Sequence, residues 1–120
     1  MTIESEHLVL VAALSKPGED ILKDLTPAKA HLLHMAVGVA GEAGELLDAI
    51  KKHCIYDKEL DRENIVEELG DLEFYMTGIR SALYISRQHV LTHNYHKLSK
   101  RYGTAYSNRA AQERADKEQQ

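Results

Sequence analysis

The 120-residue sequence has very little of several residue types whose presence would place it in particular classes of protein. It contains one cysteine, two prolines and no tryptophan. Because Cys54 has no partner for an internal disulfide, the chain does not use the disulfide framework of small secreted domains. No apolar run approaches the roughly 20 residues that cross a membrane. The N-terminus also lacks a basic region followed by an apolar signal core, so we expect a cytoplasmic protein without membrane partners.

The charge balance argues against a nucleic-acid-binding protein. The formal net charge is -4, with 15 lysines and arginines against 19 acids. This balance gives no general positive field that would attract phosphate backbones, and no basic face interleaved with aromatic residues is present. The hydrophobic fraction of 43% and the charged fraction of 28% are ordinary for a soluble globular domain. Any phosphate contacts must therefore come from a local group of basic residues.

The hydrophobic pattern predicts an all-α bundle of four to five helices, because helical spacing recurs and strand-like alternation does not. Thr26-Pro27, Asp61 and Ser86 are typical helix starts, and Gly103 stands where a helix-ending residue with positive φ is expected. We expect one domain over 1–103 and a polar tail over 104–120, whose short helix would pack on a neighbouring subunit. The helices expected in the domain span 3–14, 27 to about 53, 62 to 83 or 84, and 87–102.

Acidic residues occupy the inward side of the helix that begins at Thr26-Pro27. On a helical wheel Glu42 falls among Met35, Val39 and Leu46, and Glu45 follows one turn along the same side. These two carboxylates therefore project together, at positions that a helix normally gives to core residues. Two inward carboxylates need a cation to balance them.

The next helix repeats the arrangement. Glu68 shares its side with Leu72 and Ile79, and Asp71 follows one turn along. Two other acids of this helix, Glu63 and Glu73, lie on the opposite side and are expected to be solvated surface residues. Glu67 lies at an edge between the two sides and belongs clearly to neither.

Carboxylates alone form a hard oxygen site, which favours Mg²⁺ or Mn²⁺ over zinc. A di-iron bundle would require a histidine three residues after a ligating Glu, and here those positions are Glu45 and Asp71. A second metal site from His89, His93 and His96 is not favoured, because these residues lie away from the apolar stripe and are expected to be solvated.

Positive charge comes from the helix after Ser86. Asn94, Lys97 and Arg101 share its apolar side. Long basic side chains often lie along a core edge with their charged ends in water. Since two other helices direct acids inward, however, the three helices together have the groups needed to hold a metal and a polyphosphate.

Glycines recur every three residues beside the first acidic pair, at positions 38, 41 and 44. Each costs about 1 kcal/mol of helix propensity relative to alanine. Close helix packing and room for a ligand beside the carboxylates explain them equally well.

Three segments in this order resemble the MazG-type all-α nucleoside triphosphate pyrophosphohydrolases. The family pattern is an E-x-x-E helix followed by an E-x-x-D helix, seen here as Glu42-Ala-Gly-Glu45 and Glu68-Leu-Gly-Asp71. The sequence segments around these motifs, residues 41–52 and 67–72, also look like family signatures, as does Asn94-Tyr-His-Lys-Leu-Ser-Lys-Arg-Tyr102. The resemblance covers about residues 33–102.

The resemblance implies hydrolysis of a nucleoside triphosphate between its α and β phosphates, which controls nucleotide pools in bacteria or, for a phage-encoded member, in the host cytoplasm. It implies Mg²⁺, with Mn²⁺ as a substitute, on Glu42, Glu45, Glu68 and Asp71, with Glu42 or Glu45 as the general base. It also implies a homodimer or homotetramer. The residues expected to bind substrate are Lys52, Asn94, Lys97 and Arg101.

Some features are left open by these residues. Asp48 is an outer-shell candidate, and His34 lies where it would touch a bound base rather than the metal. The expected substrate is a purine deoxynucleotide such as dGTP. The alternative to an enzyme is a non-catalytic helical assembly subunit that senses metal or nucleotide.

Overall fold

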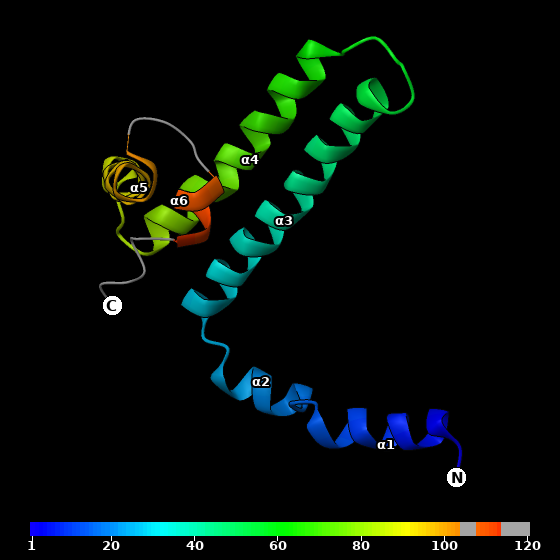
Figure 1. Cartoon of the computed structure of the whole chain (residues 1–120). Helices are drawn as coiled ribbons and strands as arrows, with labels where there is room; N and C mark the ends of the chain where they lie inside the picture. Colours follow the sequence, from blue (N-terminus) through cyan, green and yellow to red (C-terminus); the bar gives the residue numbers. More distant parts are fainter. Residues whose placement is uncertain (104–107, 114–120) are drawn as a thin grey trace.

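The computed structural model describes residues 1–103 and 108–113, and in these ranges every regular element is an α-helix (Figure 1). The predicted all-α class is therefore confirmed. The helices are α1 (Ile3–Leu14), α2 (Gly18–Asp24), α3 (Pro27–Cys54), α4 (Arg62–Ala82), α5 (Arg87–Tyr102) and α6 (Asn108–Glu113).

The predicted starts of the three long helices are confirmed by their capping hydrogen bonds. The backbone N–H of Lys29 donates to the Thr26 hydroxyl at 3.2 Å, ahead of the proline at the first turn of α3. Equivalent bonds to Asp61 at 3.1 Å and to Ser86 at 3.0 Å open α4 and α5. At the end of α5, Gly103 has the positive φ expected of it, 68°. Local sequence chemistry thus defines where these helices begin and where α5 ends.

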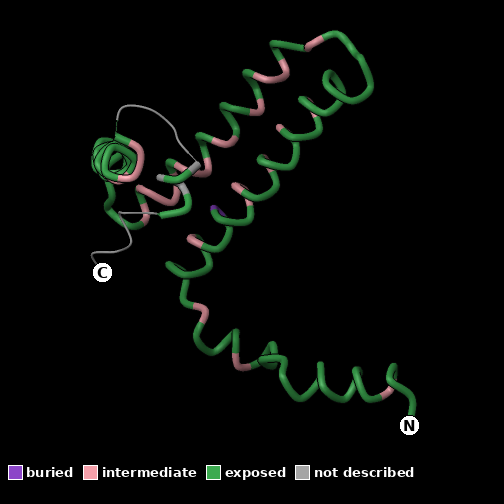
Figure 2. Tube along the Cα trace, viewed as in Figure 1, coloured by how far each residue is buried: buried purple, intermediate pink, exposed green. Residues whose placement is uncertain are grey.

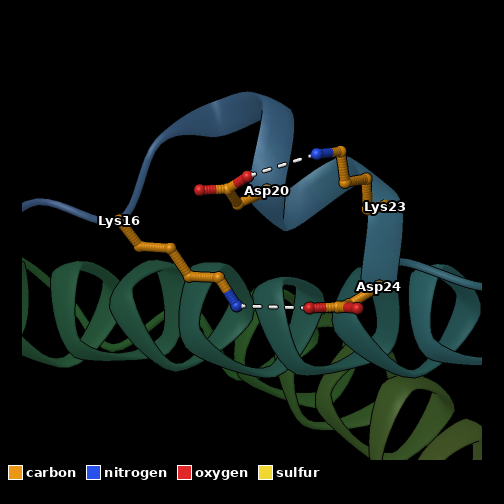
Figure 3. Close-up of polar contacts among 4 residues, drawn as sticks. All are labelled: Lys16, Asp20, Lys23 and Asp24. Atoms are coloured by element: carbon orange, nitrogen blue, oxygen red, sulfur yellow. Dashed lines mark hydrogen bonds and ion pairs between the residues drawn. The ribbon is translucent and has the colours of Figure 1, made fainter.

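The sequence pattern missed α2, which is only seven residues long and too short to show an apolar stripe. Acidic residues in its first turn and Lys23 in its last turn suit the helix dipole. Two exposed ion pairs accompany it (Figure 3): Lys16 with Asp24 at 3.5 Å and Lys23 with Asp20 at 3.7 Å. The first of these links the turn before α2 to the last residue of α2.

Helices α3 and α4 form an antiparallel hairpin that contains most of the packing in the described chain (Figure 1). Met35 is buried, with 7% of its surface exposed, and the half-buried residues of both helices follow the seam between them (Figure 2). Leu72 and Ile79 are among these half-buried residues, as the wheel predicts. The apolar stripes therefore pair α3 with α4.

Two glycines set how closely the helices of this hairpin approach. A Cβ atom on Gly38 of α3 would overlap the Tyr75 ring of α4, and a Cβ atom on Gly78 of α4 would overlap the Met35 side chain of α3. On each helix, therefore, a glycine packs against a large side chain of the other helix. The other two glycines of the predicted run, Gly41 and Gly44, have no such neighbour within 4 Å. Close packing is therefore the reason for Gly38 alone.

We expect Gly38→Ala to destabilise the protein and Gly41→Ala to leave it unchanged or stabilise it. The new methyl group at position 38 meets the Tyr75 ring, and such overpacking costs about 1 to 3 kcal/mol. At position 41 the methyl group meets open space, so the gain of helix propensity, up to about 1 kcal/mol, dominates. Urea unfolding of both variants checks this, and equal midpoints would contradict the close approach at Gly38.

The remaining helices pack little against the hairpin (Figure 1). Helix α5 lies to the side of α4, and α6 packs on α5 (Figure 1). Helices α1 and α2 lead away from the start of α3, and Ile3 and Leu14 are 81% and 76% exposed. Helix α1 therefore packs little against the rest of the described chain. No described helix has both the length and the apolarity needed to cross a membrane.

Part of the expected C-terminal tail is described. Helix α6 agrees with the short helix expected there. Residues 104–107 and 114–120 lie outside the described residues, and the packing of the tail on a neighbouring subunit stays a prediction.

Candidate functional site: an acidic cluster between α3 and α4

Three of the four predicted acids come together at the seam of the hairpin. Glu42 of α3 and both Glu68 and Asp71 of α4 each offer a carboxylate oxygen, and these oxygens lie within 4.8 Å of one another. Glu42 and Glu68 are half-buried, whereas Asp71 is exposed. The cluster is therefore open to solvent on one side and bordered by packed helix on the other.

The hairpin register places these residues opposite one another. Glu42 follows Gly38 by four residues on α3, and Asp71 precedes Tyr75 by four residues on the antiparallel α4. Four residues are about one helical turn. The acids therefore lie about one turn beyond the contact between Gly38 and Tyr75.

Glu68 shows the electrostatic effect of this crowding. Its pKa is raised above the ordinary value of 4.5, first by partial burial, which disfavours the charged carboxylate. A side-chain hydrogen bond with Glu42 raises it further, as do the negative charges of Glu42, Glu45 and Asp71. A bound cation would relieve this repulsion.

Glu45 stands apart from the other three acids. It is exposed and is not one of the residues whose oxygens lie within 4.8 Å of one another, yet its charge is close enough to raise the pKa of Glu68. The structure therefore puts Glu45 at the border of the cluster.

The predicted basic residues are not gathered at the acids. Lys52 pairs with Asp48 at 3.1 Å, one turn earlier on α3. Lys97 and Arg101 are half-buried and Asn94 is exposed, all on α5, which lies to the side of α4 away from α3 (Figure 1). The Arg101 guanidinium lies over the Tyr102 ring, 5.8 Å from its centre. How the α5 residues meet a phosphate stays a prediction.

Other polar residues behave as solvated surface. Glu63, Glu67 and Glu73 are exposed, and Glu73 pairs with Arg87 at 3.7 Å.

The histidines form no second cluster of metal-binding groups within the described residues. His89, His93 and His96 are exposed and do not converge with other ligand atoms as Glu42, Glu68 and Asp71 do. His34 lies edge-on to Tyr75, with their ring centres 6.2 Å apart.

The donor chemistry of the cluster fits a hard divalent cation. Glu42, Glu68 and Asp71 offer only carboxylate oxygens, which suit Mg²⁺ or Mn²⁺. Because Asp71 is exposed, water or substrate oxygens have access to this side of the cluster. All three residues of this cluster are acids that the sequence predicted as metal ligands.

Comparison with known proteins gives one result. No curated protein matches the chain, and no solved structure matches it. The family model described as the MazG nucleotide pyrophosphohydrolase domain matches residues 31–105, which include α4, α5 and nearly all of α3. The match covers well over half of the chain, and all four acids of E-x-x-E and E-x-x-D lie within it. The chain belongs to the MazG nucleotide pyrophosphohydrolase family.

Proposed function

We propose that this protein hydrolyses a nucleoside triphosphate between the α and β phosphates, giving the monophosphate and pyrophosphate, with Mg²⁺ as the metal and Mn²⁺ as a substitute. The observation that carries the proposal is the convergence of Glu42, Glu68 and Asp71 across the hairpin of a MazG-family chain. The crowding that raises the pKa of Glu68 adds support, because it marks a site with more negative charge than the protein alone can balance.

Glu42, Glu68 and Asp71 would hold the metal. When bound, a divalent metal supplies charge neutralisation for the phosphates and lowers the pKa of a bound water. The partial burial of Glu42 and Glu68 fixes the position of their carboxylates against the seam. The exposed side at Asp71 is where the triphosphate would approach.

We assign the general base to Glu45 rather than to Glu42. Glu45 lies beside the cluster but is not one of its three converging acids, so its oxygens stay available to accept a proton from the attacking water. Glu42 shares a hydrogen bond with Glu68 and belongs to the group that would hold the metal.

Phosphate binding is assigned to Lys97 and Arg101, with Asn94 orienting a phosphate or the sugar and Lys52 as a further contact. The proposed substrate is a deoxynucleoside triphosphate such as dGTP, and the proposed assembly is a homodimer or homotetramer. The protein is proposed to act in the cytoplasm.

Product analysis tests the proposed function. The purified protein is incubated with each of the eight common ribo- and deoxynucleoside triphosphates and Mg²⁺, and the products are separated. We expect pyrophosphate and a monophosphate from at least one nucleotide, and no turnover in excess chelator. Orthophosphate with a diphosphate would contradict the cleavage position, and nucleotide binding without turnover would favour the non-catalytic assembly subunit.

Removing the positive charges of α5 should weaken nucleotide binding. Lys97→Ala and Arg101→Ala each remove a donor of charge-assisted hydrogen bonds, so KM should rise about tenfold or more, as expected for a loss of about 1.5 to 3 kcal/mol. Lys100→Ala is the matched control, because Lys100 is exposed on the same helix. Steady-state kinetics would place the phosphate site elsewhere if KM were unchanged in both variants.

A further inference from the structure

Helix α1 exposes an apolar surface that its own chain does not cover. Leu8, Val9, Leu10 and Val11 are consecutive, so their side chains point to every side of the helix, and all four are exposed. The second half of α1, residues 8–14, is thus apolar all round, and a helical segment of this kind is normally buried. In this chain α1 instead leads away from the hairpin, joined to it through α2 (Figures 1 and 2).

The exposed area of the chain is larger than that of a compact monomer of its mass. The accessible surface is 10053 Å², whereas a folded monomer of 13.5 kDa exposes about 6,500 Å². The excess is thus about 3,500 Å², more than the roughly 1,000 to 2,500 Å² that each subunit of an obligate homodimer buries.

The hairpin carries an apolar groove at the end from which this arm emerges. Two adjoining cavities, of about 480 and 570 Å³, share His31 and have mostly apolar walls. Met35, Phe74 and Gly78 line the first, and Leu32, Ala82 and Leu83 are among the residues of the second. Phe74 is 65% exposed. We call the surface formed by the residues that line these two cavities the hairpin groove.

We propose that the arm, residues Ile3–Asp24, is exchanged between two copies of this chain, with α1 of each copy lying in the hairpin groove of the other. The groove offers the apolar surface that α1 lacks, and the area exposed by one chain is enough for a stable dimer. The charges do not oppose this placement: Lys29 lines the groove and is opposite in sign to Glu4 and Glu6 in the first turn of α1. Glu73 also lines the groove but is paired with Arg87 at 3.7 Å.

A lipid surface is a poorer occupant. Helix α1 carries Glu4 and Glu6 and has no lysine or arginine, so an anionic membrane repels it. Folding back onto the same chain would require reversal at Leu25 and Thr26, where the structure directs the arm away from the hairpin.

Complementation between two variants tests the exchange. Leu10→Glu with Leu14→Glu places charges on the arm, and Phe74→Glu places one in the groove. Each variant alone should form the oligomer less readily. The protein concentration at which its oligomer dissociates should be at least tenfold higher than for the parent protein. An equal mixture contains one intact arm and one intact groove in each mixed dimer, and should regain at least twice the mass of 13.5 kDa. Lys58→Glu, in the loop at the far end of the hairpin, is the control for added negative charge.

Light scattering measures the mass of the assembly, and circular dichroism measures its helical content. Regained mass on mixing supports exchange, and where a variant is unfolded alone, regained helical signal on mixing supports it equally. A monomeric parent protein, variants that assemble as the parent does, or no recovery on mixing would overturn the proposal. In particular, folded monomeric variants that do not complement one another would place α1 on its own hairpin.

Discussion

Replacing Glu68 with glutamine is expected to lower kcat by at least about 100-fold, the scale on which losing one preorganised electrostatic group slows an enzyme. Glutamine keeps the size of the side chain but removes the negative charge that would face the metal. The fold should survive the change, because glutamine removes a negative charge that partial burial and the neighbouring carboxylates already disfavour, as the raised pKa of Glu68 indicates. Turnover of the nucleotide identified by the product analysis is the measurement.

Glu67→Gln is the matched control. Glu67 precedes Glu68 on the same helix, but it is exposed and lies outside the acidic cluster. Its substitution should keep kcat within about twofold, as expected of a surface change away from the site. Equal losses in the two variants would show that activity depends on the general charge of α4 and not on the cluster.

Asp71→Asn should raise the melting temperature of the metal-free protein by several degrees and abolish the stabilisation that Mg²⁺ gives the parent. The first effect follows because the substitution removes one of the charges that repel Glu68. The second follows because a site that loses a ligand no longer binds the ion, and saturating an intact site at 100 times Kd contributes about 2.7 kcal/mol. Thermal melts with chelator and with excess Mg²⁺ measure both effects.

Glu45→Gln distinguishes a base from a ligand. If Glu45 accepts the proton, this variant should lose turnover while keeping most of the stabilisation by Mg²⁺. Loss of that stabilisation would return Glu45 to the set of metal ligands. A lowered metal-free melting temperature in both variants would mean that these acids are held in ion pairs, since breaking such pairs is destabilising.

The raised pKa of Glu68 also gives the metal-free protein a pH dependence. Between the ordinary value of 4.5 and the raised value, the folded state binds more protons at Glu68 than the unfolded state does. The contribution of Glu68 to stability therefore falls as pH rises through the raised pKa. Excess Mg²⁺ should reduce this loss.

Much of the site could be predicted because its information is local. The spacing of Glu42 and Met35 on one helix, and of Glu68 and Leu72 on another, fixes which side each acid occupies. The capping residues Thr26, Asp61 and Ser86 act within one turn of their own position, so a sequence pattern reveals them directly. The two inward sides could meet only by pairing α3 with α4.

What the sequence could not give depends on contacts between distant elements. Glu45 shares its side of α3 with Glu42, and only the position of α4 decides that Glu42 enters the group of three while Glu45 lies at its border. The same limit applies to Lys97. Its helical spacing places it on the apolar side of α5, but the spacing does not say which helix that side faces. The glycines differ for the same reason, since only Gly38 of the run meets a side chain of α4.

The reciprocal glycine contacts, Gly38 with Tyr75 and Gly78 with Met35, divide the chain by its tolerance of insertions and deletions. One residue inserted between Gly38 and Glu42 would turn Glu42 by about 100° away from α4, and a deletion between Asp71 and Tyr75 would do the same to Asp71. The loop between Cys54 and Arg62 lies beyond both contacts and both acids. It can change length without altering the register, so variation in length among related chains belongs in this loop rather than in the helical segments that join the glycine contacts to the acids.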